Sequence, residues 1–68
     1  MLKRSLTIAG HRTSIALEPE FWAALEALAA KRGLGLTAVI EEIDRGRDTP
    51  NLSSALRVAV LREAQSEA

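Results

Sequence analysis

Residues able to perform acid–base or nucleophilic chemistry are few in this sequence, and their spacing assembles no catalytic set. The one histidine, His11, lies in a predicted turn beside Arg12, where an imidazole is usually solvated or bonded to the backbone. Ser53 and Ser54 precede a predicted helix, as capping residues do, and no base is placed to activate them. The sequence therefore predicts a protein that is not an enzyme.

The sequence also contains no complete set of residues for binding a metal ion or a phosphate group. The chain has no cysteine and one histidine, which excludes thiolate and multi-histidine metal sites within one chain. Glu41 and Glu42 are adjacent on a predicted helix and point about 100° apart, as on a solvated face. The segment Gly33-Leu34-Gly35 reads as a turn between helices, because no strand precedes it and no Lys-Ser/Thr follows. No metal and no cofactor are expected.

The chemistry that the sequence does offer is cationic and lies near its start. Residues 1–17 contain Lys3, Arg4 and Arg12 and no acidic residue, a net charge of +3. Residues 18–68 contain six basic and nine acidic residues, a net charge of −3. The formal net charge of zero, which alone argues against a nucleic-acid binder, is thus a cancellation between a basic start and an acidic remainder.

The basic segment, residues 2–17, is expected to be extended. Aliphatic and small polar residues alternate in it with the period of two that a half-buried strand shows, first around Leu6 and Ile8 and then around Ile15 and Leu17. Gly10 can supply the positive φ of a tight turn between the two stretches. The second stretch is the more secure strand. The first is either a strand paired with it or a flexible basic arm.

Three helices are predicted after the extended segment. The first spans 19–32, because Pro19 suits a first helical turn and Gly33 a left-handed stop. The second spans 36–45. The third spans 52–65, is capped by Asn51 or Ser53, and is apolar over so much of its circumference that it is expected to be buried on more than one side.

The length of 68 residues allows one domain, 1–68, with a core that is marginal on its own. Hydrophobic residues make up 47% of the chain, and small aliphatic domains without disulfides often gain stability by association. A homodimer is therefore expected. No apolar run approaches the roughly 20 residues of a membrane span, and no signal-peptide pattern is present. We expect a cytoplasmic protein without a membrane partner.

The order of strand, helix, glycine-containing turn and helix resembles the ribbon-helix-helix DNA-binding family, which includes the Arc and methionine repressors. The chain is more closely similar to short bacterial ribbon-helix-helix proteins that combine a KR-S-x-T-I-x-G-H-R-T-S-I start with an N-L-S-S-A-L-R-V ending. These segments are Lys3 to Ile15 and Asn51 to Val58 here. The resemblance implies an α+β, mainly α, intertwined homodimer. It also implies a transcription regulator, such as a repressor, that inserts a dimeric antiparallel β-ribbon into the major groove of double-stranded DNA.

The resemblance assigns roles to individual residues. Contacts with bases are expected from the outer face of the ribbon, at Arg12, Ser14 and Ala16, although a solvated strand face carries such residues too. Contacts with the DNA backbone are expected from Lys3, Arg4, His11, Leu36 and Thr37. The apolar residues expected in the core or the dimer interface are Ile15, Leu17, Phe21, Trp22, Leu25, Leu28, Val39, Ile40, Ile43, Leu56 and Val60.

Two features depart from the family pattern and keep a second function open. A strand before residue 10 would be additional to the ribbon, and would either extend the basic surface or cover the reading face. The third helix is additional as well, and could bind a protein partner. The alternative function is a protein-interaction adaptor or antitoxin-like partner on the same scaffold, with weak or no DNA binding.

Overall fold

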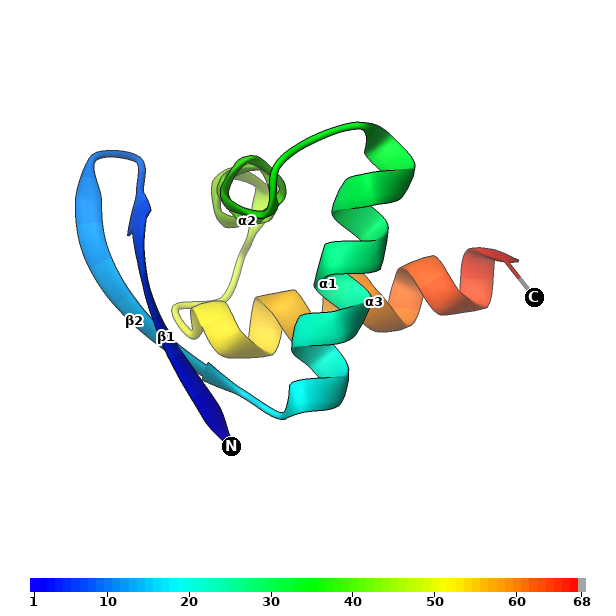
Figure 1. Ribbon diagram of the computed structural model, residues 1–68, viewed down its shortest axis with the longest axis horizontal. Helices are drawn as coiled ribbons and strands as arrows, with labels where there is room; N and C mark the ends of the chain where they lie inside the picture. Colours follow the sequence, from blue (N-terminus) through cyan, green and yellow to red (C-terminus); the bar gives the residue numbers. More distant parts are fainter. Residues whose placement is uncertain (68) are drawn as a thin grey trace.

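The elements follow one another as an antiparallel hairpin and three helices, which confirms the expected mainly helical α+β fold class (Figure 1). The computed structural model describes residues 1–67, so Ala68, the last residue of the expected domain 1–68, lies outside the described residues. The hairpin consists of β1 (Leu2–Ile8) and β2 (His11–Leu17). The helices are α1 (Pro19–Arg32), α2 (Leu36–Gly46) and α3 (Leu52–Glu67). In this described part, no helix has the length and apolar character needed to cross a membrane.

The first extended stretch is a paired strand and not a flexible arm. All of β1 pairs with β2, from Leu2 opposite Leu17 to Ile8 opposite His11. The turn between them has a φ of 52° at Ala9 and 83° at Gly10, and two positive φ values match the right-handed twist of a two-residue hairpin. The N–H of Ala9 donates a 2.9 Å hydrogen bond to Oε2 of Glu41 in α2. The end of the hairpin is thereby fastened to a helix.

The helix boundaries follow from their capping contacts. Gly33, with a φ of 70°, ends α1 and donates to the carbonyl of Ala30 at 3.2 Å. Asn51 precedes α3, and its Oδ1 accepts a 3.1 Å bond from the N–H of Ser54. Of the two capping residues considered above, Asn51 is the one that makes this contact.

Two helices are longer than the ranges expected from the sequence. The second ends at Gly46 instead of 45, because the N–H of Arg47 still bonds to the carbonyl of Asp44 at 3.4 Å. The third ends at Glu67 instead of 65, and a salt bridge from Lys31 holds its last turn. Both extensions depend on polar contacts that cannot be predicted from the hydrophobic pattern of the sequence.

The core lies between one face of the hairpin and the three helices. Leu17, Leu25 and Leu56 are fully buried, and Trp22 is 1% exposed. Of the apolar residues expected in the core or the dimer interface, three are half-buried: Phe21, Ile43 and Val60. The other eight are buried within this one chain: Ile15, Leu17, Trp22, Leu25, Leu28, Val39, Ile40 and Leu56.

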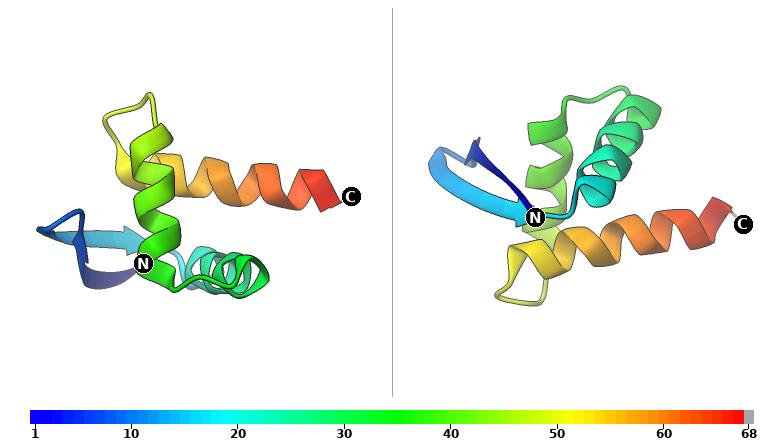
Figure 2. Two further views of the ribbon diagram at one scale, coloured as in Figure 1. Left: turned by 90° about the horizontal axis from the view of Figure 1, so that it is seen from above. Right: turned by 60° about the horizontal axis from the view of Figure 1, so that its bottom comes forward.

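The strand β1 and the helix α3, which flank the central strand, helix, turn and helix, close this core. Ile8 of β1 and Leu56 of α3 belong to the same buried cluster as Trp22. Figure 2 shows the hairpin at one end of the molecule and α3 extending past α1 at the other. Large apolar side chains that remain exposed include Val58 and Leu61, both on α3. A single chain thus buries most of the apolar residues that were expected from the sequence in the core or the dimer interface.

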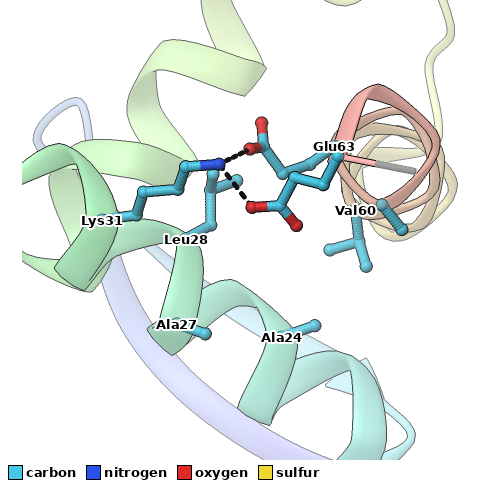
Figure 3. A pocket seen from close by; sticks show the side chains of 8 residues that line it. Ala24, Ala27, Leu28, Lys31, Val60 and Glu63 are labelled. Atoms are coloured by element: carbon cyan, nitrogen blue, oxygen red, sulfur yellow. Dashed lines mark hydrogen bonds and ion pairs between the residues drawn. The ribbon is translucent and has the colours of Figure 1, made fainter.

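Opposite charges hold the C-terminal part of α3 against α1 (Figure 3). Lys31 Nζ donates to Oε2 of Glu63 at 2.8 Å and also to Oε1 of Glu67. These hydrogen bonds, first the one donated to Glu63 and then the one donated to Glu67, raise the pKa of Lys31. The hydrogen bond from Lys31 lowers the pKa of Glu63. Leu28 and Val60 line the groove that the charges bridge.

If α3 is part of the core, truncating its buried side chain must destabilise the whole fold. We expect Leu56→Ala to lower the free energy of unfolding by about 2–5 kcal/mol, because it leaves a cavity between α3 and the hairpin. Leu61→Ala on the same helix, where the side chain is 55% exposed, should change it by less than about 0.5 kcal/mol. Urea unfolding followed by Trp22 fluorescence measures both. Equal effects would show that α3 is an appendage.

The charged contact between α1 and α3 makes stability depend on acid pH. Folding lowers the pKa of Glu63 from its ordinary value of 4.5. Such a carboxyl stabilises the fold at pH values above its ordinary pKa, and this contribution is lost as the pH falls through the lowered pKa. We therefore expect wild type to have a higher urea midpoint than Lys31→Ala at about pH 7, and the two midpoints to converge near about pH 3. A gap of unchanged size at the lower pH would contradict the contact.

Candidate nucleic-acid interface

The register of the hairpin assigns every strand residue to one of two faces. Residues opposite each other in antiparallel strands share a face, and successive residues alternate. Ile15 and Leu17 are buried, so their face is the one turned to the helices. The opposite side, here called the outer face, consists of three cross-strand pairs: Lys3 with Ala16, Ser5 with Ser14, and Thr7 with Arg12.

The outer face is polar and open to solvent. Its side chains are exposed except that of Ala16, which is half-buried. The hydroxyls of Ser5 and Ser14 lie 3.4 Å apart. Nη1 of Arg12 donates to Oγ1 of Thr7 at 3.5 Å. These long contacts leave the hydroxyls and most of the guanidinium donors available to a ligand.

The electrostatics of the outer face are positive. Lys3 and Arg12 lie at its two ends, and residues 1–17 contain no acidic side chain that could neutralise them. Glu18, which follows β2, forms a 3.0 Å ion pair with Arg57 of α3. A hydrogen bond from its own backbone N–H and one from Arg57 lower the pKa of Glu18. The nearest carboxylate along the chain is therefore already paired with a helix.

Two residues expected to contact DNA, Arg4 and His11, do not belong to the outer face of the hairpin. Arg4 is opposite Ile15, with its guanidinium carbon 4.7 Å from the centre of the Trp22 ring and Nη1 3.5 Å from Oε1 of Glu26. His11 is opposite Ile8, next to the turn, and is exposed. The structure therefore gathers Lys3 and Arg12 on the outer face and directs Arg4 toward α1.

The remaining expected contacts, Leu36 and Thr37, begin α2. Gly35 precedes them in an extended conformation and provides no side-chain cap. The side chain of Leu36 is half-buried and packs against the core cluster. These residues lie on a different element from the outer face, although α2 packs against β1.

Ser5 and Thr7 are outer-face residues that the sequence analysis did not assign. Their signal was present, since both continue the alternation that begins at Lys3. They could be assigned only once β1 was known to pair with β2, because a flexible arm has no fixed faces. Within residues 1–67, no three histidine or carboxylate side chains gather to hold a metal ion.

The hairpin, the exposed cationic outer face and the two following helices define a ribbon-helix-helix protein. The family model of the ribbon-helix-helix domain matches residues 1–64, and the chain belongs to this family. Members are generally DNA-binding transcription regulators or antitoxins and usually bind DNA as dimers. The comparisons with curated proteins and with solved structures gave no match.

The two faces of β1 can be separated by neighbouring substitutions. We expect Arg4→Ala to lower the free energy of unfolding by roughly 0.5–2 kcal/mol, because it removes the cation from the Trp22 ring. Lys3→Ala, one residue earlier on the outer face, should change it by less than about 0.5 kcal/mol. Thermal unfolding measured by circular dichroism distinguishes them. Destabilisation by Lys3→Ala alone would show that the faces are assigned the wrong way round.

Proposed function

We propose that this protein is a sequence-specific DNA-binding transcription regulator whose outer face enters the major groove. One observation supports this most directly. A hairpin whose inner face is locked into the core presents two cations, three hydroxyls and no carboxylate on its other face. A major groove about 12 Å wide admits a two-stranded ribbon of this kind.

Each outer-face residue of β2 suits a particular contact. The Arg12 guanidinium can donate two parallel hydrogen bonds to O6 and N7 of guanine. The Ser14 hydroxyl donates or accepts, and so suits either type of base pair. The Ala16 methyl can contact the methyl group of thymine. Arg12 therefore carries most of the proposed specificity.

Contacts with phosphates fix the register of the complex and supply salt-dependent affinity. Lys3 is suited to this role at the end of the outer face, and the first N–H groups of α2, at Leu36 and Thr37, can receive a second phosphate. His11 lies beside the ribbon end. Arg4 is engaged by Trp22 and Glu26, so we assign it a contribution to the electrostatic potential and not a direct contact.

The regulator is proposed to act as a homodimer. Two copies double the positive charge available at the DNA, and a two-fold protein reads a palindromic operator. The half-buried Phe21 and the exposed Val58 and Leu61 lie together on α1 and α3 and could contribute to such a contact.

The function is tested by selecting duplex DNA from a random library at low salt and measuring the affinity of the selected site. We expect Arg12→Ala to weaken binding by about 5- to 150-fold, the equivalent of 1–3 kcal/mol for a bidentate contact with guanine. The control is Arg62→Ala, an exposed cation on α3, which should leave the affinity within about twofold. Equal losses from both substitutions would indicate attraction by charge alone.

The alternative function, a protein-interaction adaptor or antitoxin-like partner, is favoured by the exposed Val58 and Leu61 on α3, 41% and 55% exposed. Single exposed aliphatic residues are common on protein surfaces, so this observation ranks second. A folded wild-type protein that selects no DNA at low salt would overturn the DNA-binding proposal and favour the adaptor.

A further inference from the structure

We propose that Arg57 is a positioning residue for DNA binding: it holds the carboxylate of Glu18 against α3 and thereby keeps one end of the outer face free of negative charge. This inference rests on the proposed function and adds to it a residue that touches no DNA. Arg57 belongs to the segment Asn51 to Val58, and the contacts with DNA proposed above use no residue of that segment.

Glu18 begins where the outer face ends. It follows β2 directly and has an extended backbone, with a φ of −61° and a ψ of 146°. The alternation that turns Ser14 and Ala16 outward therefore continues to Glu18. Since Ala16 is the partner of Lys3, Glu18 lies diagonally across from Lys3, a separation that two long side chains can span. An unrestrained Glu18 carboxylate could thus reach this end of the outer face.

A carboxylate at that place would oppose DNA binding. It would repel the phosphates and offset the charge of Lys3, on which the electrostatic part of the affinity depends. Residues 1–17 contain no acidic side chain, so Glu18 is the first carboxylate in the chain. The direction in which its side chain is held therefore determines whether this end of the outer face is positive or neutral.

The guanidinium of Arg57 holds Glu18 and is itself held by two further side chains. Its Nε donates to Oε1 of Glu18 at 3.1 Å, and its Nη2 lies 3.0 Å from the same oxygen. Its central carbon lies 5.7 Å from the centre of the Phe21 ring, and Nη2 also donates to Sδ of Met1 at 3.4 Å. These contacts fix the guanidinium in one orientation, and the carboxylate is fixed with it.

The ion pair is formed on the helical side of the hairpin. Arg57 is half-buried, and the preceding residue, Leu56, is fully buried in the cluster that contains Ile15 and Leu17. The helix that carries Arg57 packs against β2 and α1, with its first turns near the hairpin (Figure 1). Arg57 therefore draws the Glu18 carboxylate toward the helices and away from the side that faces DNA.

Removal of the Arg57 charge tests the positioning role. We expect Arg57→Met, which keeps an aliphatic side chain against Phe21, to weaken binding to the selected DNA about three- to tenfold at about 0.05 M salt, because the released carboxylate repels nearby phosphates. The matched control is Arg62→Met, which removes an exposed cation from the same helix and should change the affinity by less than about twofold. Equal losses from both variants would overturn the inference.

A second background separates positioning from a role of Arg57 in folding or in contacting DNA itself. In Glu18→Gln, the same Arg57→Met substitution should weaken binding by less than about twofold, because a neutral amide does not repel phosphate. Thermal unfolding checks that every variant is folded at the assay temperature. A loss of the same size in both backgrounds would show that Arg57 does not act through Glu18, and the inference would be wrong.

The conservative variant Arg57→Lys keeps a cation beside Glu18 and should bind the selected DNA within about twofold of wild type. A loss as large as that from Arg57→Met would also contradict the positioning role. If Arg12→Ala weakens binding and Arg57→Met does not, the role of Arg57 is wrong while the proposed function stands. If wild type selects no DNA, both are wrong.

Discussion

The alternation of the hairpin between a buried and an open face is the constraint on which the rest of the structure depends. Burial of Ile15 and Leu17 in the core leaves Arg12 and Ser14 no orientation except outward, since side chains alternate along a strand. A shift of one residue in register would bury the guanidinium and expose the aliphatic side chains, at a cost of several kcal/mol. The apolar core thus determines which chemistry the surface presents.

The strand β1 and the helix α3 maintain this division between the two faces. The strand β1 gives β2 a partner, and α3 contributes the fully buried Leu56 beneath the sheet. The hairpin turn is fastened to α2 by Glu41, and the far end of α3 is fastened to α1 by Lys31. A chain of 68 residues thereby holds the outer face of its hairpin on one side of the molecule.

Local signals predicted much of this arrangement. The period-two alternation predicted that Arg12, Ser14 and Ala16 share the outward face of the strand. Pro19 and Gly33 predicted the two ends of the first helix. The pairing of β1 could not be decided from the sequence, because a hairpin is stabilised by packing against other elements, here by contacts of Leu2, Ile8 and Ala9 with the helices, more than by local propensity. The position of Arg4 was missed for the same reason. Its charge suggested a contact with DNA, whereas in the structure its guanidinium lies over the ring of Trp22, eighteen positions later, on the inner side of the hairpin.

The central claim is that DNA contacts the outer face of the hairpin, and methyl resonances test it most directly. Thr7 and Ala16 carry methyl groups on the outer face, whereas Ile8, Ile15 and Leu17 carry them on the core side. On titration of the labelled protein with its selected DNA, the account predicts that the Thr7 and Ala16 methyl signals shift and that the three core signals do not. Shifts confined to methyl groups of α3, with the Thr7 and Ala16 signals unmoved, would contradict it.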